Sequence, residues 1–427
     1  MSIEKQAQLA KDASLKLAVL STKAKNRALK AIAKALKNNS KLILNANKRD
    51  VEAAKKAKLN YVLVNRLMLN KHKINEMIEE VKSVTKLEDP VGKVLSQIEL
   101  DKGLNLYQVT CPIGVIGMIF ESRPDVVSQI SALCLKSGNS VILKGGSEAK
   151  NSNRILVNII SRAAERNGIT KGSIQLIETR EQVTQMLKLD EYVSLVIPRG
   201  SNSFVKYVQE HTKIPVLGHS EGICHLFIDK NANLRKAIGI SFDAKCQYPA
   251  VCNAIETLLV HKDIAKKFLP KVIKKLKQAK VEIRGDEKTR KIVKEISKAA
   301  EKDWSTEYND LILSIKVVND LNEAINHINR YGSGHTDGIV TENKQNANIF
   351  MDLVDSSSVM WNASTRFADG FRYGKGAEVG ISTSKIHSRG PVGLEGLVIY
   401  KYKLIGKGQI VKNYSGKNAR KFKHKVK

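Results

Sequence analysis

Cysteine is scarce in this chain, and its spacing excludes a disulfide framework. The five cysteines stand at positions 111, 134, 224, 246 and 252, an odd number without a CxxC pair. Small secreted proteins instead carry an even, regularly spaced set. The first residues, MSIEKQAQLAKDASLK, also lack the apolar run of a secretory signal. We therefore expect a reducing, cytoplasmic environment.

Long apolar runs are absent as well. A membrane helix requires about 18 to 20 consecutive apolar residues, and no stretch approaches this length, so we expect no membrane association. Aromatic residues make up only 5% of the chain, but the 42% apolar and 27% charged residues are ordinary for a globular protein. At roughly 150 residues per domain, the chain is long enough for two or three domains.

Acidic residues are few relative to basic ones, with 42 Asp and Glu against 72 Lys and Arg and a net charge of +30. Such a charge can indicate nucleic-acid binding. However, only 17 of the basic residues are Arg, and they are dispersed along the chain. Specific sites combine clustered Arg with aromatic side chains. We predict no specific nucleic-acid partner, and a frayed, solvated tail where six basic residues fall between Lys417 and Lys427.

Several familiar motifs are missing. The nine histidines show no HxxxH spacing and the cysteines no zinc-finger spacing, so we predict no metal site. Walker A and GxSxG sequences are absent, which argues against a P-loop site and a serine hydrolase elbow. The glycine pairs never complete GxGxxG after a strand. Any catalytic or binding residues are therefore expected outside these familiar motifs.

The apolar pattern indicates an α/β fold. Residues 10–85 have helical periodicity, and 92–111 reads as a hairpin around Asp101-Lys102-Gly103. From 112 to about 230, short apolar runs alternate with helical stretches, and a second such series follows, with helices expected at 262–280 and 319–330. Alternation of this kind predicts parallel βα units. We expect two α/β lobes, a hairpin and a terminal strand.

The strand candidates are ten short apolar runs. They are VIGMIF, SVILKG, SIQLIE, SLVIP and IPVLG in the first series, CHLFID, IETLLVH, LSIKVV and DGIVTE in the second, and GLVIYKYKLIG, which reads as a lone strand near the C-terminus.

Three segments have the character of anion sites. Lys144 ends an apolar run and precedes two glycines, and Arg199 precedes Gly200 and Ser201 in the same way. Backbone N–H groups and a basic side chain could then face a phosphate. Ordinary βα turns with N-caps explain these segments equally well. Arg123 in FESRPDV could bind a carboxylate or phosphate, or form a structural ion pair.

Two cysteines illustrate the two roles open to a thiol. Cys134 lies on an apolar helical face, which predicts a core position. Cys252, in YPAVCNAIETLLVH, lies where a loop meets a strand and could be exposed enough to react. Composition alone favours an inert structural thiol there, because most buried thiols are unreactive.

Eight segments occur in an order that is far more specific than any single motif. They are CPIGVIGMIFESRPDVV, GNSVILKGGSEAKNSN, IPRGSNSFV, VLGHSEGICHLFID, YPAVCNAIETLLVH, GSGHTDGIVTEN, WNASTRFADG and GISTSKIHSRGPVGLEGL. Together they closely resemble the gamma-glutamyl phosphate reductases, a family within the aldehyde dehydrogenase superfamily. The resemblance extends to about residue 411. It implies an aldehyde dehydrogenase-like fold and NADPH-dependent reduction of L-glutamyl 5-phosphate to L-glutamate 5-semialdehyde through a cysteine thioester, in proline biosynthesis.

The resemblance also implies roles for individual residues. Cys252 matches the nucleophile. The cofactor residues implied are Lys144, Gly145, Gly146 and Ser147 at the adenosine ribose, Gly200 and Ser201 at the pyrophosphate, and Glu307 at the nicotinamide ribose. Arg123, Asn362 and Arg366 are expected to hold the substrate's amino acid end and phosphate, a placement that rests on their chemistry.

A domain scheme follows from the same resemblance. Residues 1–91 and 112–221 would form a Rossmann-like NADP-binding domain and 222–396 the catalytic domain. Residues 92–111 and 397–411 would form an oligomerisation element, leaving 412–427 as a basic tail. The resemblance implies a homo-oligomer acting on a small-molecule substrate, which a separate glutamate 5-kinase supplies.

The chain departs from hydrolytic aldehyde dehydrogenases at two points. Phe120-Glu121-Ser122 stands where those enzymes carry PWN, and LGHSEG replaces ELGGK, with Glu221 out of register for a water activator. This suits a thioester that meets phosphate or hydride and not water, and leaves the Cys252 backbone N–H as a candidate oxyanion donor. A hydrolytic dehydrogenase and a non-catalytic basic protein are the competing interpretations.

Overall fold

The computed structural model describes residues 1–219 and 221–427 and divides them into two compact units. Unit 1 comprises Met1–Leu217, Gly376–Gly380 and Val392–Lys427, and unit 2 comprises Gly218–Lys375 and Ile381–Pro391. The chain thus passes from the first unit to the second after Leu217, and the domain boundary expected at 221/222 stays a prediction. Each unit is described by itself.

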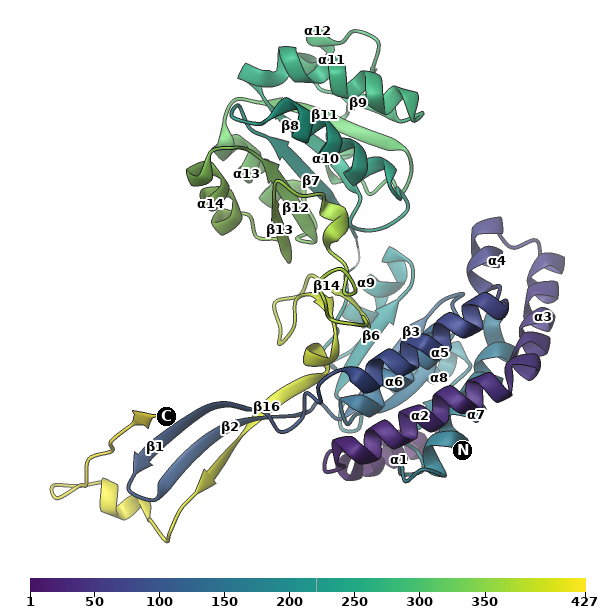
Figure 1. Ribbon diagram of the computed structural model, residues 1–427, viewed down its shortest axis with the longest axis vertical. Coiled ribbons are helices and arrows are strands. Elements are labelled where there is room, and N and C mark those ends of the chain that lie inside the picture. The colour runs from purple at the N-terminus through teal and green to yellow at the C-terminus, as the bar shows by residue number, and fades with distance from the viewer. Residues whose placement is uncertain (220) are drawn as a thin grey trace. The chain divides into compact units, whose positions relative to one another are not determined.

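Unit 1 is an α/β domain with an added antiparallel sheet (Figure 1). Its helices are α1 (Ile3–Leu17), α2 (Thr22–Asn38), α3 (Ser40–Lys56), α4 (Tyr61–Leu67), α5 (Lys71–Lys86), α6 (Val126–Lys136), α7 (Lys150–Glu165), α8 (Arg180–Met186) and α9 (Asn202–Glu210). Its strands are β1 (Val94–Asp101), β2 (Leu104–Pro112), β3 (Val115–Phe120), β4 (Ser140–Lys144), β5 (Ile174–Leu176), β6 (Leu195–Arg199), β16 (Val398–Ile405) and β17 (Lys425–Val426).

The parallel sheet of unit 1 has the strand order β5-β4-β3-β6. Successive side chains of a strand point to opposite faces. Met118 accordingly joins a core with α2, α5, α6 and α7, whereas Ile119 joins a core with α1 and α8 on the other face. Both faces are covered, which explains why these strands read as continuous apolar runs.

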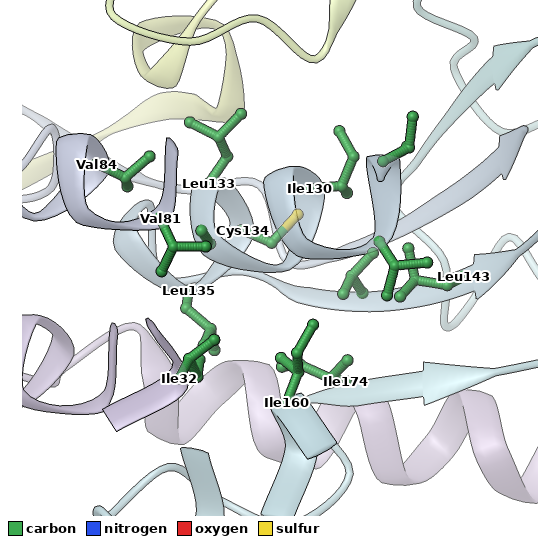
Figure 2. Close-up of a cluster of buried hydrophobic side chains, with 14 of the residues drawn as sticks. Ile32, Val81, Val84, Ile130, Leu133, Cys134, Leu135, Leu143, Ile160 and Ile174 are labelled. Atoms are coloured by element: carbon green, nitrogen blue, oxygen red, sulfur yellow. The ribbon is translucent and has the colours of Figure 1, made fainter. Parts of the chain in front are cut away.

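The larger of these two cores contains Cys134. Figure 2 shows its thiol on α6, among apolar side chains that include Ile130, Leu143 and Ile160. Cys134 is 1% exposed, and burial raises the pKa of its thiol well above the ordinary range. The predicted core position is therefore confirmed, and this thiol is not positioned to react.

A second sheet of unit 1 has the order β16-β2-β1-β17 and is antiparallel. The predicted hairpin is present as β1 and β2. The predicted C-terminal strand is present as β16, which pairs with β2 from Val398 opposite Pro112 to Ile405 opposite Asn105. Periodicity identifies a strand but not its partner, which here lies almost 300 positions away.

The expectation of a frayed tail was wrong, although nearly all of its residues are exposed to solvent as predicted. β17 pairs with β1, with Val426 opposite Ile98. The rings of Tyr414 and Phe422 stack with centroids 4.6 Å apart, and the Tyr414 hydroxyl donates to Asp101 at 3.1 Å. Charge density indicated solvation, but acidic groups on β1 and an aromatic pair hold the segment in place.

Unit 2 is a second α/β domain. Its strands are β7 (Cys224–Ile228), β8 (Ile255–His261), β9 (Glu282–Gly285), β10 (Ser297–Lys298), β11 (Ile312–Val318), β12 (Thr336–Val340) and β13 (Ser358–Trp361), and its helices are α10 (Leu234–Cys246), α11 (Lys262–Gln278), α12 (Glu287–Ile292), α13 (Leu321–Tyr331) and α14 (Lys344–Leu353). The strands form one parallel sheet in the order β10-β9-β11-β8-β7-β12-β13. Two short strands, β14 (Gly380–Ser382) and β15 (Gly390–Val392), pair where the chain changes units.

The strand predictions hold with one exception. IPVLG, at 214–218, forms only an isolated bridge between Val216 and Val196. Pro215 lacks the N–H that a longer ladder would require. The sequence also gave no sign of the short strands β9, β10 and β13, which lack a long apolar run. Among the described residues, no helix combines the length and apolar character needed to cross a bilayer.

Candidate active site

Cys252 lies in a tight turn directly before β8, at the predicted junction of loop and strand. The turn is closed by the Ala254 N–H, which donates to the Val251 carbonyl at 2.9 Å. The carbonyl of Cys252 accepts from the Cys224 thiol at 3.1 Å. Cys252 is half-buried, unlike the fully buried Cys224 and Cys134. The turn therefore holds its backbone firmly while leaving the residue partly accessible.

The sheet order explains what surrounds this thiol. β8, β7 and β12 are adjacent and parallel, so their amino ends lie at the same edge of the sheet. Cys252 precedes β8, His219 precedes β7 and His335 directly precedes β12. One ligand atom from each of these three side chains lies within 4.8 Å of the others. A Cys–His–His cluster thus forms from three segments, the outermost of which are 116 positions apart in the chain.

The two histidines differ in their surroundings. His335 is fully buried, and burial, with a smaller contribution from His219, holds the pKa of its ring well below the ordinary range. The His335 imidazole is therefore neutral. The Nδ1 atom of His219 lies 2.9 Å from the Ile381 carbonyl oxygen. A carbonyl only accepts hydrogen bonds, so Nδ1 carries the proton and, in the neutral ring, Nε2 carries the lone pair.

Glu307 supports the same turn through Gly222. The Gly222 N–H donates to the Glu307 carboxylate at 3.0 Å. A Cβ atom on Gly222 would lie 2.2 Å from the Cys252 carbonyl oxygen, far inside van der Waals contact. Only glycine allows this close packing. Glu307 is thus linked to Cys252 through one residue, and its predicted contact with a ribose stays a prediction.

The two residues predicted from WNASTRFADG have different positions. Arg366 is 9% exposed, its Nε donates to Gln247 at 2.9 Å, and it lies close enough to Cys252 for an electrostatic interaction. Asn362 instead bonds the backbone of Thr341 with both side-chain atoms, at 2.9 and 2.8 Å. Arg366 therefore lies near Cys252, whereas the hydrogen bonds of Asn362 stabilise a local bend. A substrate contact of either residue stays a prediction.

A buried ion pair lies on the β8 side of the turn. The Lys245 ammonium at the end of α10 is 2.6 Å from the Glu256 carboxylate, and both side chains are at most 1% exposed. Burial raises the pKa of Glu256 to about 7, against the opposing effect of Lys245. The Asn309 N–H also donates to Glu256 at 3.3 Å. This pair fixes α10 to β8, the two elements that flank Cys252.

The predicted cofactor loops of unit 1 follow three adjacent strands. Gly145 and Gly146 follow β4, Gly200 follows β6, and Glu121 follows β3 between them. The chain moves from β3 to β4 and β5 and then returns to the other side of β3 for β6. Such a switch point, at the carboxyl ends of the strands, is where open α/β sheets bind ligands.

Close packing accounts for these glycines. A Cβ on Gly145 would lie 2.0 Å from Asn153 Nδ2, and one on Gly146 would lie 1.9 Å from Glu148 Oε1. At the start of α9 the Ser201 N–H donates to the Glu121 carboxylate at 3.2 Å. This helix N-terminus therefore already faces an anionic side chain.

Lys144 carries a positive charge at the same edge. It is half-buried, and burial lowers the pKa of its ammonium, with Arg180 acting in the same direction and Glu148 opposing. Ser147 is exposed and begins the turn of 3₁₀ helix after the two glycines. Lys144 and Arg180 thus place two positive charges near one another, and the Ser147 hydroxyl follows in the same loop. Contact of Lys144 and Ser147 with a cofactor stays a prediction.

The segment that replaces PWN is also defined. Ser122 has a positive φ of 44°, and both its N–H and its hydroxyl donate to Glu148, at 2.6 and 2.7 Å. Arg123 forms an exposed ion pair with Asp125 at 3.2 Å. The structural alternative for Arg123 is therefore present, and its substrate role stays a prediction.

The sequence reasoning missed His219 and His335. They stand in VLGHSEG and GSGHTDG, each shortly before a predicted strand. Their position before a strand could have indicated a functional role, but their proximity to Cys252 depends on the strand order β8-β7-β12.

Comparison with known proteins gives a consistent result. The model of the aldehyde dehydrogenase family matches residues 1–302. A gamma-glutamyl phosphate reductase of Methanococcoides burtonii is 58% identical over 99% of this chain and 96% of its own, and one of Acetivibrio thermocellus is 56% identical over 99% and 98%. The crystal structure of gamma-glutamyl phosphate reductase from Thermotoga maritima superposes with a TM-score of 0.94 at 45% identity, covering 96% of this chain and all of that one. The chain therefore belongs to the aldehyde dehydrogenase family and, within it, to the gamma-glutamyl phosphate reductases.

Proposed function

We propose that the chain reduces L-glutamyl 5-phosphate to L-glutamate 5-semialdehyde and phosphate with NADPH, the second step of proline biosynthesis from glutamate. The observation that carries this proposal is a partly accessible Cys252, clustered with His219 and His335, in a chain 58% identical to a gamma-glutamyl phosphate reductase. A thiol in a cluster of this kind is suited to acyl transfer.

Cys252 acts as the nucleophile in this proposal. Its thiolate attacks the acyl carbon, the bond from that carbon to the phosphate oxygen breaks, and phosphate leaves with the electron pair. Arg366 favours the thiolate electrostatically, and its guanidinium would bind the departing phosphate. The Cys252 backbone N–H stabilises the oxyanion. The product of this step is a thioester on Cys252.

The loops of unit 1 fit a dinucleotide. The donor at Ser201 already holds the Glu121 carboxylate, which stands in for a pyrophosphate oxygen. Lys144 and Arg180 would bind the 2′-phosphate that distinguishes NADPH from NADH, while Ser147 bonds the ribose. Glu307 would accept from the nicotinamide ribose. When bound, NADPH supplies the hydride that reduces the acyl carbon.

Cys252 is then released unchanged. The reduced carbon carries an alkoxide, and its collapse breaks the carbon–sulfur bond to give the aldehyde and the thiolate. The sequence lacks the PWN and ELGGK motifs of hydrolytic aldehyde dehydrogenases, which favours reduction of the thioester over its hydrolysis.

We further propose that the protein is a cytoplasmic homo-oligomer supplied by a separate kinase. β16 is an edge strand with exposed Ile399, Tyr402 and Leu404, and an apolar edge of this kind is suited to pairing with a second copy. The described residues contain no disulfide, which is compatible with a reducing compartment. An acyl phosphate needs a phosphoryl-transfer enzyme to make it.

Running the reaction in reverse tests the function, because the semialdehyde is easier to handle than the acyl phosphate. The protein is mixed with glutamate semialdehyde and NADP⁺, with and without phosphate, and NADPH absorbance is followed. We expect reduction of NADP⁺ that requires phosphate. Reduction without phosphate would instead indicate hydrolysis of the thioester, and no reduction by folded protein with NADP⁺ or NAD⁺ would contradict the proposal.

A further inference from the structure

The Cys252 cluster has a composition that its proposed chemistry does not require. A cysteine nucleophile needs at most one histidine beside it, yet two histidines lie here. One ring nitrogen of each histidine and the Cys252 sulfur all lie within 4.8 Å of one another. Their rings are 4.8 Å apart between centroids and meet edge to face. Thiolate sulfur and imidazole nitrogen are the ligands that Zn²⁺ and similar cations prefer.

The outer contacts of the histidines suit metal binding. A metal-bound histidine usually donates its second ring N–H to a carbonyl or a similar oxygen, which fixes the ring. His219 has this arrangement through Nδ1 and the Ile381 carbonyl, and His335 Nδ1 lies 2.9 Å from the Thr336 hydroxyl. His335 is fully buried, and its Nε2 has no hydrogen-bond partner among the described residues. A buried nitrogen of this kind is costly unless something binds it.

We propose that His219, Cys252 and His335 form a binding site for a thiophilic divalent cation of the Zn²⁺ class. Binding replaces the thiol proton of Cys252, which leaves to solvent, with a sulfur–metal bond, and two neutral imidazoles complete three of four tetrahedral positions. The bound cation caps the nucleophile and stops turnover. This regulatory consequence rests on the proposed function, whereas the metal binding does not.

The geometry requires only a small adjustment. Tetrahedral zinc with bonds of about 2.0 to 2.3 Å places its ligand atoms about 3.3 to 3.6 Å apart, so a cluster within 4.8 Å must contract by about 1 Å. His219 lies in an irregular segment outside the strands, where such a shift is feasible. Arg366 is near Cys252 and repels a cation. We therefore expect reversible binding, not a permanent structural metal.

Cobalt provides a direct test, because Co²⁺ in a zinc site absorbs visible light and its thiolate bond gives a near-ultraviolet charge-transfer band. Metal-free protein is titrated with Co²⁺ and then with Zn²⁺. We expect one equivalent of Co²⁺ to produce both absorptions and Zn²⁺ to abolish them. C252S should lose the charge-transfer band, and H219Q and H335Q should each bind Co²⁺ at least about 10-fold more weakly.

The matched controls are C111S and H72Q, a free cysteine and an exposed histidine outside the cluster, which should bind as the parent protein does. Circular dichroism identifies any variant that fails to fold. If one histidine variant does not fold, the other alone is enough to test the site. No cobalt absorption, a band retained in C252S, or unchanged affinity in a folded histidine variant would overturn the site. Zn²⁺ should also inhibit the phosphate-dependent assay, with reversal by a chelator. Cobalt absorption in a protein without reductase activity would uphold the metal site and refute only the proposed function.

Discussion

Gly222 and Cys252 are in direct backbone contact. A Cβ on Gly222 would lie 2.2 Å from the Cys252 carbonyl oxygen and 2.5 Å from its Cβ. The Gly222 N–H is held in turn by Glu307 at 3.0 Å. The position of the thiol is therefore set by a glycine that no larger residue can replace.

Gly222→Ala should accordingly displace Cys252. A shift of about 1 Å at a reacting group costs on the order of 100-fold in rate, so we expect kcat to fall by about that factor. We expect the free energy of unfolding to fall by only about 1 to 3 kcal/mol. Gly239→Ala is the matched control, since a Cβ there meets nothing within 4 Å. Near-parental turnover by Gly222→Ala would show that the contact does not position the thiol.

The Lys245–Glu256 pair gives a prediction for stability. Glu256→Gln leaves the buried Lys245 ammonium without its counterion, which should lower the free energy of unfolding by about 3 to 5 kcal/mol. Adding Lys245→Met should recover most of the loss, because both charges are then gone. Urea denaturation measures each variant, and Glu287→Gln, which removes the exposed pair with Lys291, should change stability little. Equal effects of the buried and exposed changes would contradict this account.

His327 predicts how stability depends on pH. Burial, with additional effects of His225, Lys316 and Arg330, lowers the pKa of His327 to about 2 from an ordinary value near 6.5. The unfolded chain thus binds a proton below pH 6.5 that the folded chain does not, so stability is complete above pH 6.5 and falls as the pH decreases. The expected loss is about 1.4 kcal/mol per pH unit for this residue.

Urea denaturation between pH 7 and pH 5 measures this slope. His327→Gln should remove the contribution of His327 to the slope. The contribution of His335, which is similarly buried, should remain. The exposed His72→Gln should leave the slope unchanged. A parental slope in His327→Gln would mean that other groups control acid unfolding.

The C-terminal tail should loosen when its aromatic pair is removed. Phe422→Ala eliminates the stack with Tyr414, and β17 then has two paired residues and a few exposed ion pairs to hold it against β1. We expect trypsin to cleave within 412–427 several-fold faster, as mass spectrometry would show. Val411→Ala, at an 83% exposed side chain, is the control. Unchanged cleavage would mean that the stack does not hold the tail.

Much of the fold could be predicted from local patterns, because most of the longer strands and helices carry their own periodicity, whereas the short strands β9, β10 and β13 do not. The pairing of β16 with β2 and of β17 with β1 could not, since both depend on contacts across about 300 positions. The same limit applies to the site. Cys252 was identified from its segment, but His219 and His335 join it only through the order of β8, β7 and β12.

The central claim is that Cys252 forms the acyl thioester, and mass spectrometry of its peptides tests it most directly. The protein is incubated with glutamate semialdehyde and NADP⁺ without phosphate, quenched in acid and digested. The account predicts a glutamyl adduct on the peptide containing Cys252, its loss on addition of phosphate, and no adduct in Cys252→Ala. An adduct on another cysteine, or turnover by Cys252→Ala, would contradict it.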